Sequence, residues 1–285
     1  MNPVIRDCLD GLISPEVAMA QLLFQGQTAR GIAASLAETP RHPRRDALER
    51  LLTGRERQID ALAAEVAATT VNHDASGPTP EHGIAKIASF FDRAVAHSPE
   101  ASVALYSLGD PAILAAATAE IVGWLEAKRV LAPGMDVLDL GCGFGRVAAV
   151  LAPCCRSVLG LDVSPGMVAE ARRRQAGLAN VRFEQTGGKD LATLPDAAFD
   201  LVLAIDSFPY IVQTGDAVAE RHVADAVRIL RPGGALAILN LSYRNDDVQD
   251  LADAQHWAGR HGFRLEVADP RPFQLWDASG YVLRR

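Results

Sequence analysis

Three glycines that directly follow an apolar run are the sharpest chemical feature of the sequence. They are Gly141, Gly143 and Gly145, within VLDLGCGFGR at 137–146. Glycine permits a tight turn there and lets a ligand touch the backbone. Asp162 ends the next apolar run, about 20 residues later, where a carboxylate can accept hydrogen bonds from ribose hydroxyls. The loop and the acid together predict a nucleoside site, and the alternative is a plain strand-to-helix turn.

The spacing of the glycines indicates which kind of nucleoside-containing cofactor the loop can bind. Dinucleotide binding uses G-x-G-x-x-G, in which a pyrophosphate sits on the helix N-terminus. Here the third glycine position is Arg146, so the loop is a poor pyrophosphate cradle and a nicotinamide-dependent dehydrogenase is disfavoured. Asp139, just before the loop, would repel phosphates and attract an ammonium group.

The segments that must position this loop alternate between short apolar runs and helical stretches from residue 135 onward. This alternation is typical of a parallel sheet covered on both faces. FRLEVADP and FQLWDASGYVLRR, near the end of the chain, are close enough together to predict an antiparallel β-hairpin. The predicted strands are 135–140, 157–162, 181–185, 199–205 and 235–242, and the predicted helices are 146–152, 165–176, 216–230 and 248–261.

Residues 1–130 follow a different pattern, rich in alanine and leucine and punctuated by helix starts such as Ser14-Pro15-Glu16. Gly, Pro, Ser and Asp gather in a predicted loop at 71–83. We therefore expect an all-helical N-terminal region at 1–130 and a sheet domain at 131–285. The helices predicted in the first region are 15–25, 45–69, 84–97 and 111–128.

Composition disfavours several classes of protein. The 285 residues carry a net charge of −7, so the excess of Lys and Arg that nucleic-acid binding needs is missing. No apolar run approaches about 18 residues, which predicts a cytoplasmic protein without a membrane partner. The 4 cysteines have no C-x-x-C spacing and the 7 histidines have no ligand spacing, so no metal site is expected.

Four motifs in order resemble the class I S-adenosylmethionine-dependent methyltransferases. They are VLDLGCGFGR, LGLDVSPGMVAEAR at 159–172, FDLVLAIDSFPY at 199–210 and ILRPGGALAILN at 229–240. The resemblance covers about 131–285 and implies an α/β fold, with a doubly wound, seven-stranded, mostly parallel sheet that ends in an antiparallel hairpin. It also implies S-adenosyl-L-methionine as the cofactor and methyl transfer by in-line displacement.

The resemblance also implies roles for individual residues in cofactor binding. The three glycines would wrap the methionine part, Asp139 would lie near its amino group, and Asp162 would hold the ribose diol. Val163 and Met167 would pack on the adenine, although Met167 is equally well explained as a core residue of its helix. The implied cofactor-binding set is Asp139, Gly141, Gly143, Gly145, Asp162, Val163, Met167, Gly188, Asp190 and Leu191.

The sequence departs from the family pattern after the third strand. Many members have Gly-Asp-Ala there, with the acid facing the adenine amino group, whereas this chain has TGGKDL at 186–191. Gly187 occupies the position of the acid. Either Asp190 or backbone groups of 188–191 would recognise the adenine instead, and both alternatives stay open.

Acceptor and proton-transfer candidates follow the fourth and fifth strands, because ligands of open α/β sheets bind beyond the carboxyl ends of the strands. Asp206 and Tyr210 are catalytic candidates, with His222 from the following helix, and Tyr210 and Tyr243 are candidates for acceptor contact. Asp206 is a general base or a turn cap, and His222 is a base or an ordinary helix residue. DSFPY at 206–210 lacks the Asn/Asp-Pro-Pro-Tyr/Phe motif of enzymes that methylate base amines or glutamine. A small-molecule acceptor, methylated on N or O, is favoured.

The N-terminal region supplies the remaining candidates. Residues 90–111 are expected to cover the cofactor and shape the acceptor pocket, with Tyr106 either contacting the acceptor or packing in a core. The helices at 15–69 are candidates for a homodimer surface. The alternative function is a non-catalytic S-adenosylmethionine-binding protein whose helical region docks a partner protein.

Overall fold

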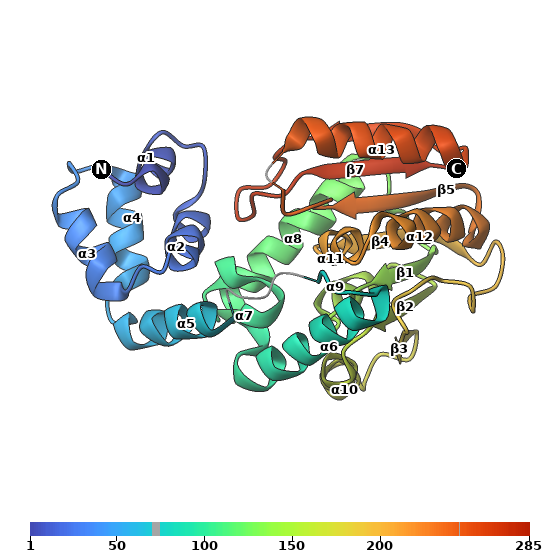
Figure 1. Ribbon diagram of the computed structural model, residues 1–285, viewed down its shortest axis with the longest axis horizontal. Helices are drawn as coiled ribbons and strands as arrows, with labels where there is room; N and C mark the ends of the chain where they lie inside the picture. Colours follow the sequence, from blue (N-terminus) through green and yellow to red (C-terminus); the bar gives the residue numbers. More distant parts are fainter. Residues whose placement is uncertain (70–74, 245) are drawn as a thin grey trace. The chain divides into compact units, whose positions relative to one another are not determined.

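The computed structural model describes residues 1–69, 75–244 and 246–285, and in these residues seven strands form one mixed sheet (Figure 1). The strand order is β3-β2-β1-β4-β5-β7-β6. β1 to β5 pair in parallel, whereas β7 is antiparallel to both β5 and β6. The expected sheet and its C-terminal hairpin are therefore confirmed. The strands are β1 (Asp136–Leu140), β2 (Ser157–Asp162), β3 (Val181–Gln185), β4 (Phe199–Ile205), β5 (Leu230–Leu239), β6 (Arg264–Asp269) and β7 (Gly280–Arg284).

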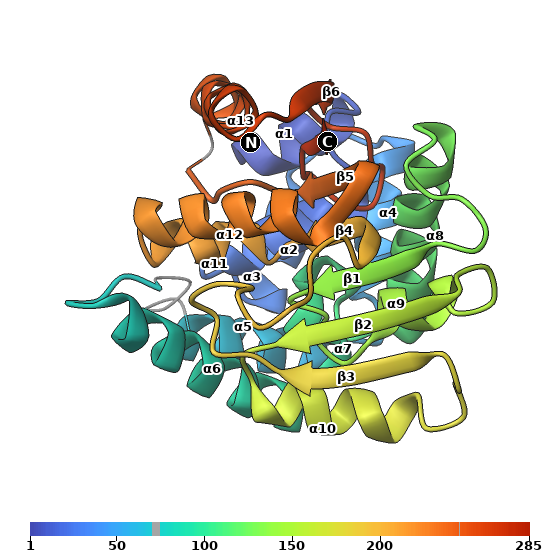
Figure 2. The same ribbon diagram turned by 90° about the vertical axis from the view of Figure 1, so that its right-hand side faces the viewer.

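The predicted strands agree with the observed ones except at the fifth. We expect 235–242 from its apolar run, but β5 already begins at Leu230, which pairs with Phe199. A register shift between Phe199 and Leu201 accommodates the Pro-Gly-Gly that follows. Figure 2 shows the arrowheads of β1, β2 and β3 at the same edge of the sheet, where the candidate residues follow the strands.

Helices pack on this sheet from several segments of the chain. α9 contacts β2, α10 contacts β2 and β3, α12 contacts β5, and α13 contacts β6. α6 lies beside α10 in both views (Figures 1 and 2). The helices are α6 (Pro80–His97), α9 (Arg146–Leu151), α10 (Pro165–Arg174), α11 (Phe208–Gln213), α12 (Asp216–Ile229) and α13 (Asp247–His261).

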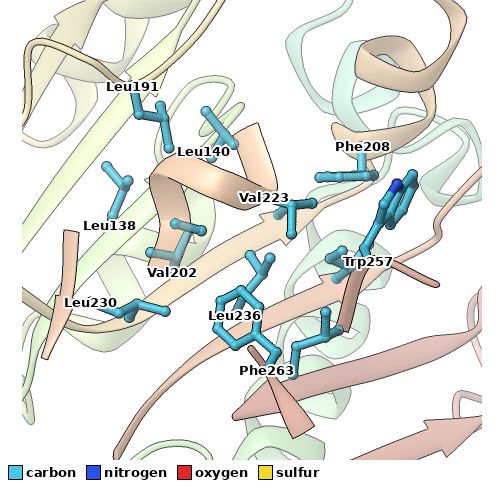
Figure 3. Close-up of a cluster of buried hydrophobic side chains, with 14 of the residues drawn as sticks. Leu138, Leu140, Leu191, Val202, Phe208, Val223, Leu230, Leu236, Trp257 and Phe263 are labelled. Carbon is cyan, nitrogen blue, oxygen red and sulfur yellow. The ribbon is translucent and has the colours of Figure 1, made fainter. Parts of the chain in front are cut away.

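A cluster of buried side chains fixes α12 and α13 to one face of the sheet (Figure 3). Leu138 and Leu140 of β1 face it together, because alternate residues of a strand point to the same side. Phe208 of α11 meets Trp257 of α13 edge-on, with ring centroids 5.4 Å apart. Because Phe208 is the first residue of α11, this core anchors the connection between β4 and α11, which carries Asp206.

The N-terminal residues form helices around a second buried cluster. Polar residues cap three of these helices: the side chains of Asn2, Ser14 and Thr28 accept hydrogen bonds from the first-turn N–H groups of α1, α2 and α3. Ile5, Leu23 and other apolar side chains of these helices fill the cluster. The elements are α1 (Pro3–Leu9), α2 (Pro15–Phe24), α3 (Ala29–Ala37), α4 (Pro43–Leu52), α5 (Glu56–Thr69), α7 (Pro99–Val103), the short 3-10 helix η1 (Leu105–Ser107) and α8 (Pro111–Ala127).

Several helix predictions need correction. The single helix expected at 45–69 is wrong: α4 and α5 are separate, and Gly54 between them has φ of 75°, which ends α4. α1, α3, α7 and α11 are absent from the predicted set, and the longest of them has 9 residues, too few to establish a periodic pattern. Residues 71–74 of the expected loop, including His73, lie outside the described residues.

The contacts divide the chain into two compact units. One comprises Met1–His73, Ser98–Glu120 and Phe273–Asp277, and the other comprises Asp74–His97, Ile121–Pro272 and Ala278–Arg285. We call them the helical unit and the sheet unit. The sheet unit therefore includes α6, which precedes the expected domain boundary at residue 130. That boundary and the homodimer surface stay predictions.

Replacing Leu236 by Ala tests the core of the sheet unit. Leu236 is buried in the cluster under α12 and α13, so the Leu236→Ala variant is expected to lower the free energy of unfolding by about 3 kcal/mol. Urea denaturation measures the change. Val248→Ala in α13 is the matched control, because Val248 is 81% exposed and its loss should change stability by less than about 0.5 kcal/mol. Equal stability of the two variants would contradict this core.

Candidate functional site

The turn after β1 contains two glycines that no other residue type could replace without strain. Gly141 has φ of 75°, and a Cβ there would lie 2.2 Å from Cβ of Ser207. Gly145 has φ of 80°, and its Cβ would lie 2.5 Å from the Phe183 ring. The Ser207 hydroxyl donates to the Leu140 carbonyl at 2.6 Å, which joins the β1 turn to the β4 turn. The glycines thus allow two strand ends and the start of α9 to meet closely.

Asp162 at the end of β2 is hydrogen-bonded to this turn. Its two carboxylate oxygens accept from the N–H groups of Gly143 and Ser164, each at 2.9 Å. Burial raises the pKa of Asp162 to about 6, although the backbone N–H groups of Ser164 and Gly143 favour its charged form. The expected pairing of a glycine loop with an acid therefore exists as a physical contact.

Asp139 lies in β1, two residues before the turn, and its carboxyl group is buried. It is 2% exposed, and Oδ2 has no hydrogen-bond partner among the described residues. Burial raises the pKa of Asp139 to about 7, and the opposing charge of Arg146 limits the rise. A buried carboxyl oxygen in this state is costly in free energy unless a donor or a cation binds to it.

An apolar surface lies beside Asp162. A Cβ on Gly188 would lie 2.7 Å from Cγ1 of Val163 and 3.1 Å from Cγ2 of Ile84 in α6, so these groups meet at one place. Met167 is buried at the start of α10. This surface offers carbon atoms to a flat, apolar ring.

The two alternatives for adenine recognition occupy different surroundings. Oδ1 of Asp190 accepts from the N–H of Ala192 at 3.2 Å, so this oxygen caps the local turn. The Leu191 side chain is buried, and its N–H donates to Asp225 at 2.8 Å. Gly187 is exposed, and a Cβ added to it would meet no atom within 4 Å. The choice between Asp190 and the backbone of 188–191 stays open.

Polar and aromatic groups gather beyond β4 and β5. Oδ1 of Asp206 accepts from the Tyr243 hydroxyl at 3.0 Å and from the Asn240 amide at 2.8 Å. Tyr210 hydrogen-bonds with Tyr243, and their rings meet edge-on at 5.4 Å. Phe91 of α6 meets Tyr210 at the same distance of 5.4 Å. We call Phe91, Asp206, Tyr210, Asn240 and Tyr243 the acceptor-side cluster.

Comparison with known proteins identifies the family. Residues 137–234 match a family model described as "Methyltransferase domain", and they contain both the glycine turn and Asp162. Residues 137–234, about a third of the chain, thus carry the methyltransferase domain that the class I resemblance implies. S-adenosylmethionine is accordingly its cofactor.

Individual relatives of this chain match over part of their length. A demethylmenaquinone methyltransferase of Tropheryma whipplei is 33% identical over 39% of this chain and 43% of its own. A trans-aconitate 2-methyltransferase of Methylobacterium nodulans is 38% identical over 40% of this chain and 41% of its own. The chain thus spans about two-fifths of the length of these curated relatives.

One solved structure extends the comparison of folds. Phosphoethanolamine N-methyltransferase 1 of Haemonchus contortus, solved with phosphoethanolamine and S-adenosylhomocysteine, aligns with a TM-score of 0.57. The alignment covers 72% of this chain and 49% of that one, with 18% identity. This likeness concerns the fold alone.

Two further candidates, His222 and Tyr106, belong to different units. His222 is buried in the middle of α12, its Nδ1 is 2.9 Å from the Val218 carbonyl, and burial lowers its pKa. This position fits the helix-packing alternative, so His222 has no part in the mechanism proposed below. Tyr106 is buried in the helical unit, where its ring lies 6.2 Å from Trp276, so its acceptor contact stays a prediction.

Sequence patterns did not single out Ile84, Phe91, Asp92 or Asn240, although the segment 90–111, which is expected to cover the cofactor, includes Phe91 and Asp92. The first three belong to α6, far upstream of the motifs, and only tertiary packing brings them to the strand ends. Asn240 directly follows β5, so the rule on strand carboxyl ends could have found it. Within the described residues, no group of three metal-ligating side chains occurs, and none of the helices is long and apolar enough to cross a membrane.

The glycine turn can be tested with two matched substitutions. Gly141→Ala must force Cβ into Ser207 at a positive φ, so cofactor affinity is expected to fall at least about tenfold, with about 1–3 kcal/mol of lost stability. Gly187→Ala, where a Cβ meets nothing within 4 Å, should leave both unchanged. Calorimetric titration with S-adenosylhomocysteine and thermal unfolding measure the two effects. Wild-type affinity in Gly141→Ala would contradict the site.

Proposed function

We propose that the protein transfers a methyl group from S-adenosylmethionine to a nitrogen or oxygen atom of a small molecule. The single observation that carries the proposal is the buried Asp139 carboxyl group beside a glycine turn that is hydrogen-bonded to Asp162. An ammonium group and a ribose diol at a fixed separation match these two acids. The amino acid and nucleoside parts of S-adenosylmethionine supply both.

The residues of the sheet unit divide the cofactor between them in this proposal. The glycine turn holds the methionine part, with its amino group on Asp139. Asp162 accepts hydrogen bonds from the ribose hydroxyls while its own position is fixed by Gly143 and Ser164. Val163, Met167, Gly188 and Leu191 would enclose the adenine. S-adenosylmethionine supplies a methyl group on a positively charged sulfur, which needs only an aligned nucleophile.

The acceptor-side cluster would orient that nucleophile. Burial raises the pKa of Tyr210 and of Tyr243 above the ordinary value, so both phenols keep their protons at neutral pH. They therefore act as hydrogen-bond donors and not as bases. Asp206 is the general base of the cluster and takes the proton that the methylated atom loses. Hydrogen bonds from Asn240 and Tyr243 fix its carboxylate. Orientation alone can lower the barrier by about 7–11 kcal/mol.

Several observations support a small acceptor. The two matched relatives are named for demethylmenaquinone and trans-aconitate. The net charge of −7 disfavours a nucleic acid as the acceptor. Asp206 and Tyr210 of the acceptor-side cluster belong to DSFPY, which differs from the motif of enzymes that methylate base amines. The aromatic rings of Phe91, Tyr210 and Tyr243 suit an acceptor with an apolar part.

Replacing Asp162 by Ala tests the proposed function. Loss of the carboxylate removes the ribose contact and the partner of the Gly143 N–H, so the dissociation constant of S-adenosylhomocysteine should rise at least about 30-fold. Titration calorimetry measures it, and Glu184→Ala, which removes an exposed acid of β3, is the matched control and should leave the affinity unchanged.

The companion assay follows S-adenosylhomocysteine production across a panel of small amines, carboxylic acids and phenols. Wild-type turnover of at least one compound is expected. Binding without turnover on any panel member, together with capture of a stable protein partner, would instead favour the non-catalytic alternative. No binding of either cofactor form would overturn the proposal.

A further inference from the structure

Asp92 in the middle of α6 is hydrogen-bonded to the loop that carries Asp162. Its Oδ1 accepts from the Ser164 hydroxyl at 2.6 Å and from the Gly166 N–H at 2.8 Å. A Cβ on Gly166 would lie 2.8 Å from this oxygen and 3.3 Å from Cγ1 of Val95. Glycine at 166 therefore allows α6 to approach the start of α10 closely.

One residue connects Asp92 to the proposed ribose acid. The Ser164 hydroxyl donates to Asp92, while the Ser164 N–H donates to Oδ1 of Asp162. Ser164 is fully buried, and its Oγ also accepts from the Met167 N–H at the start of α10. The position of α6 and the orientation of the Asp162 carboxylate are thus coupled through a single buried side chain.

Other residues of α6 contact the other parts of the site. Near its N-terminus, Glu81 pairs with Lys189 at 2.6 Å, and Ile84 packs where Val163 and Gly188 meet. One residue before Asp92, Phe91 meets Tyr210 of the acceptor-side cluster. α6 therefore touches the proposed adenine surface near its N-terminus, and the ribose loop and the acceptor surface about two turns later.

We propose that Asp92 is the latch that closes α6 over the cofactor and acceptor sites. This inference rests on the proposed function. Closure sets Asp162 through Ser164 and brings Ile84 to the adenine surface and Phe91 to the acceptor-side cluster. Asp92 is a positioning residue, since it acts on the cofactor through Ser164 and Asp162.

The test compares four variants of the full chain. Asp92→Ala removes both hydrogen bonds but improves intrinsic helix propensity, so a loss does not come from melting α6. Asp92→Asn keeps an accepting oxygen, and Gly166→Ala pushes α6 away by its added Cβ. Arg93→Ala is the matched control, because Arg93 is exposed and its guanidinium bonds to Ser89 within α6.

We expect Asp92→Ala and Gly166→Ala to raise the dissociation constant of S-adenosylhomocysteine about tenfold. In the ligand-free protein, hydrogen exchange should accelerate in 80–97 and stay unchanged in β1 and β4. Asp92→Asn should restore most of both properties, and Arg93→Ala should match wild type. Wild-type affinity together with wild-type exchange in Asp92→Ala and Gly166→Ala would overturn the latch.

Failure of the proposed function has a different signature. If the wild type binds neither S-adenosylmethionine nor S-adenosylhomocysteine, the cofactor assignment fails, whereas exchange in the ligand-free variants still decides whether Asp92 holds α6. Acceleration throughout the sheet unit would show that Asp92 stabilises the fold generally, and that outcome also overturns the latch.

Discussion

The burial of one carboxyl group beside a sharp glycine turn constrains the rest of the site. Asp139 points away from the apolar cluster that Leu138 and Leu140 join, because neighbouring residues of a strand face opposite sides. Its burial raises its pKa to about 7, which reflects the free-energy cost of keeping the charged form there. In our account the amino group of the cofactor compensates for this cost, and the glycines keep side chains out of the space that it needs.

The sheet unit contains nearly all of the candidate chemistry. Asp139, Asp162 and the acceptor-side cluster belong to it, and α6 joins it although residues of the helical unit lie on both sides of α6 in sequence. The helical unit has a buried cluster of its own. We therefore assign cofactor binding, methyl transfer and closure to residues within the sheet unit.

The sequence alone predicted those features that depend on local pattern. Buried parallel strands need continuous apolar runs, so the predicted strands match the observed ones closely apart from the start of β5. The sequence also predicts the pairing of the glycine turn with Asp162, because a tight turn and a ribose partner restrict the residue types. Contacts between side chains that lie far apart in the sequence have no such local pattern. The segment 90–111 is expected to cover the cofactor, but nothing local singles out Phe91 or Asp92 within it, and Ile84 lies outside it. His222 shows the converse: its residue type suggested proton transfer, while its place in α12 is a packing position.

The most direct test of the central claim is the exchange of protons on cofactor binding. With the pKa of Asp139 raised to about 7 in the ligand-free protein, an ammonium group bound beside it must favour the ionised form and expel the proton. Affinity for S-adenosylhomocysteine should then increase as pH rises from about 6 to 8, and titration at pH 7 in two buffers of different ionisation enthalpy should show release of about half a proton. Asp139→Asn should remove most of both effects, and Asp162, with its pKa raised to about 6, should account for a smaller remainder near pH 6. Binding that is independent of pH and releases no proton would contradict the account.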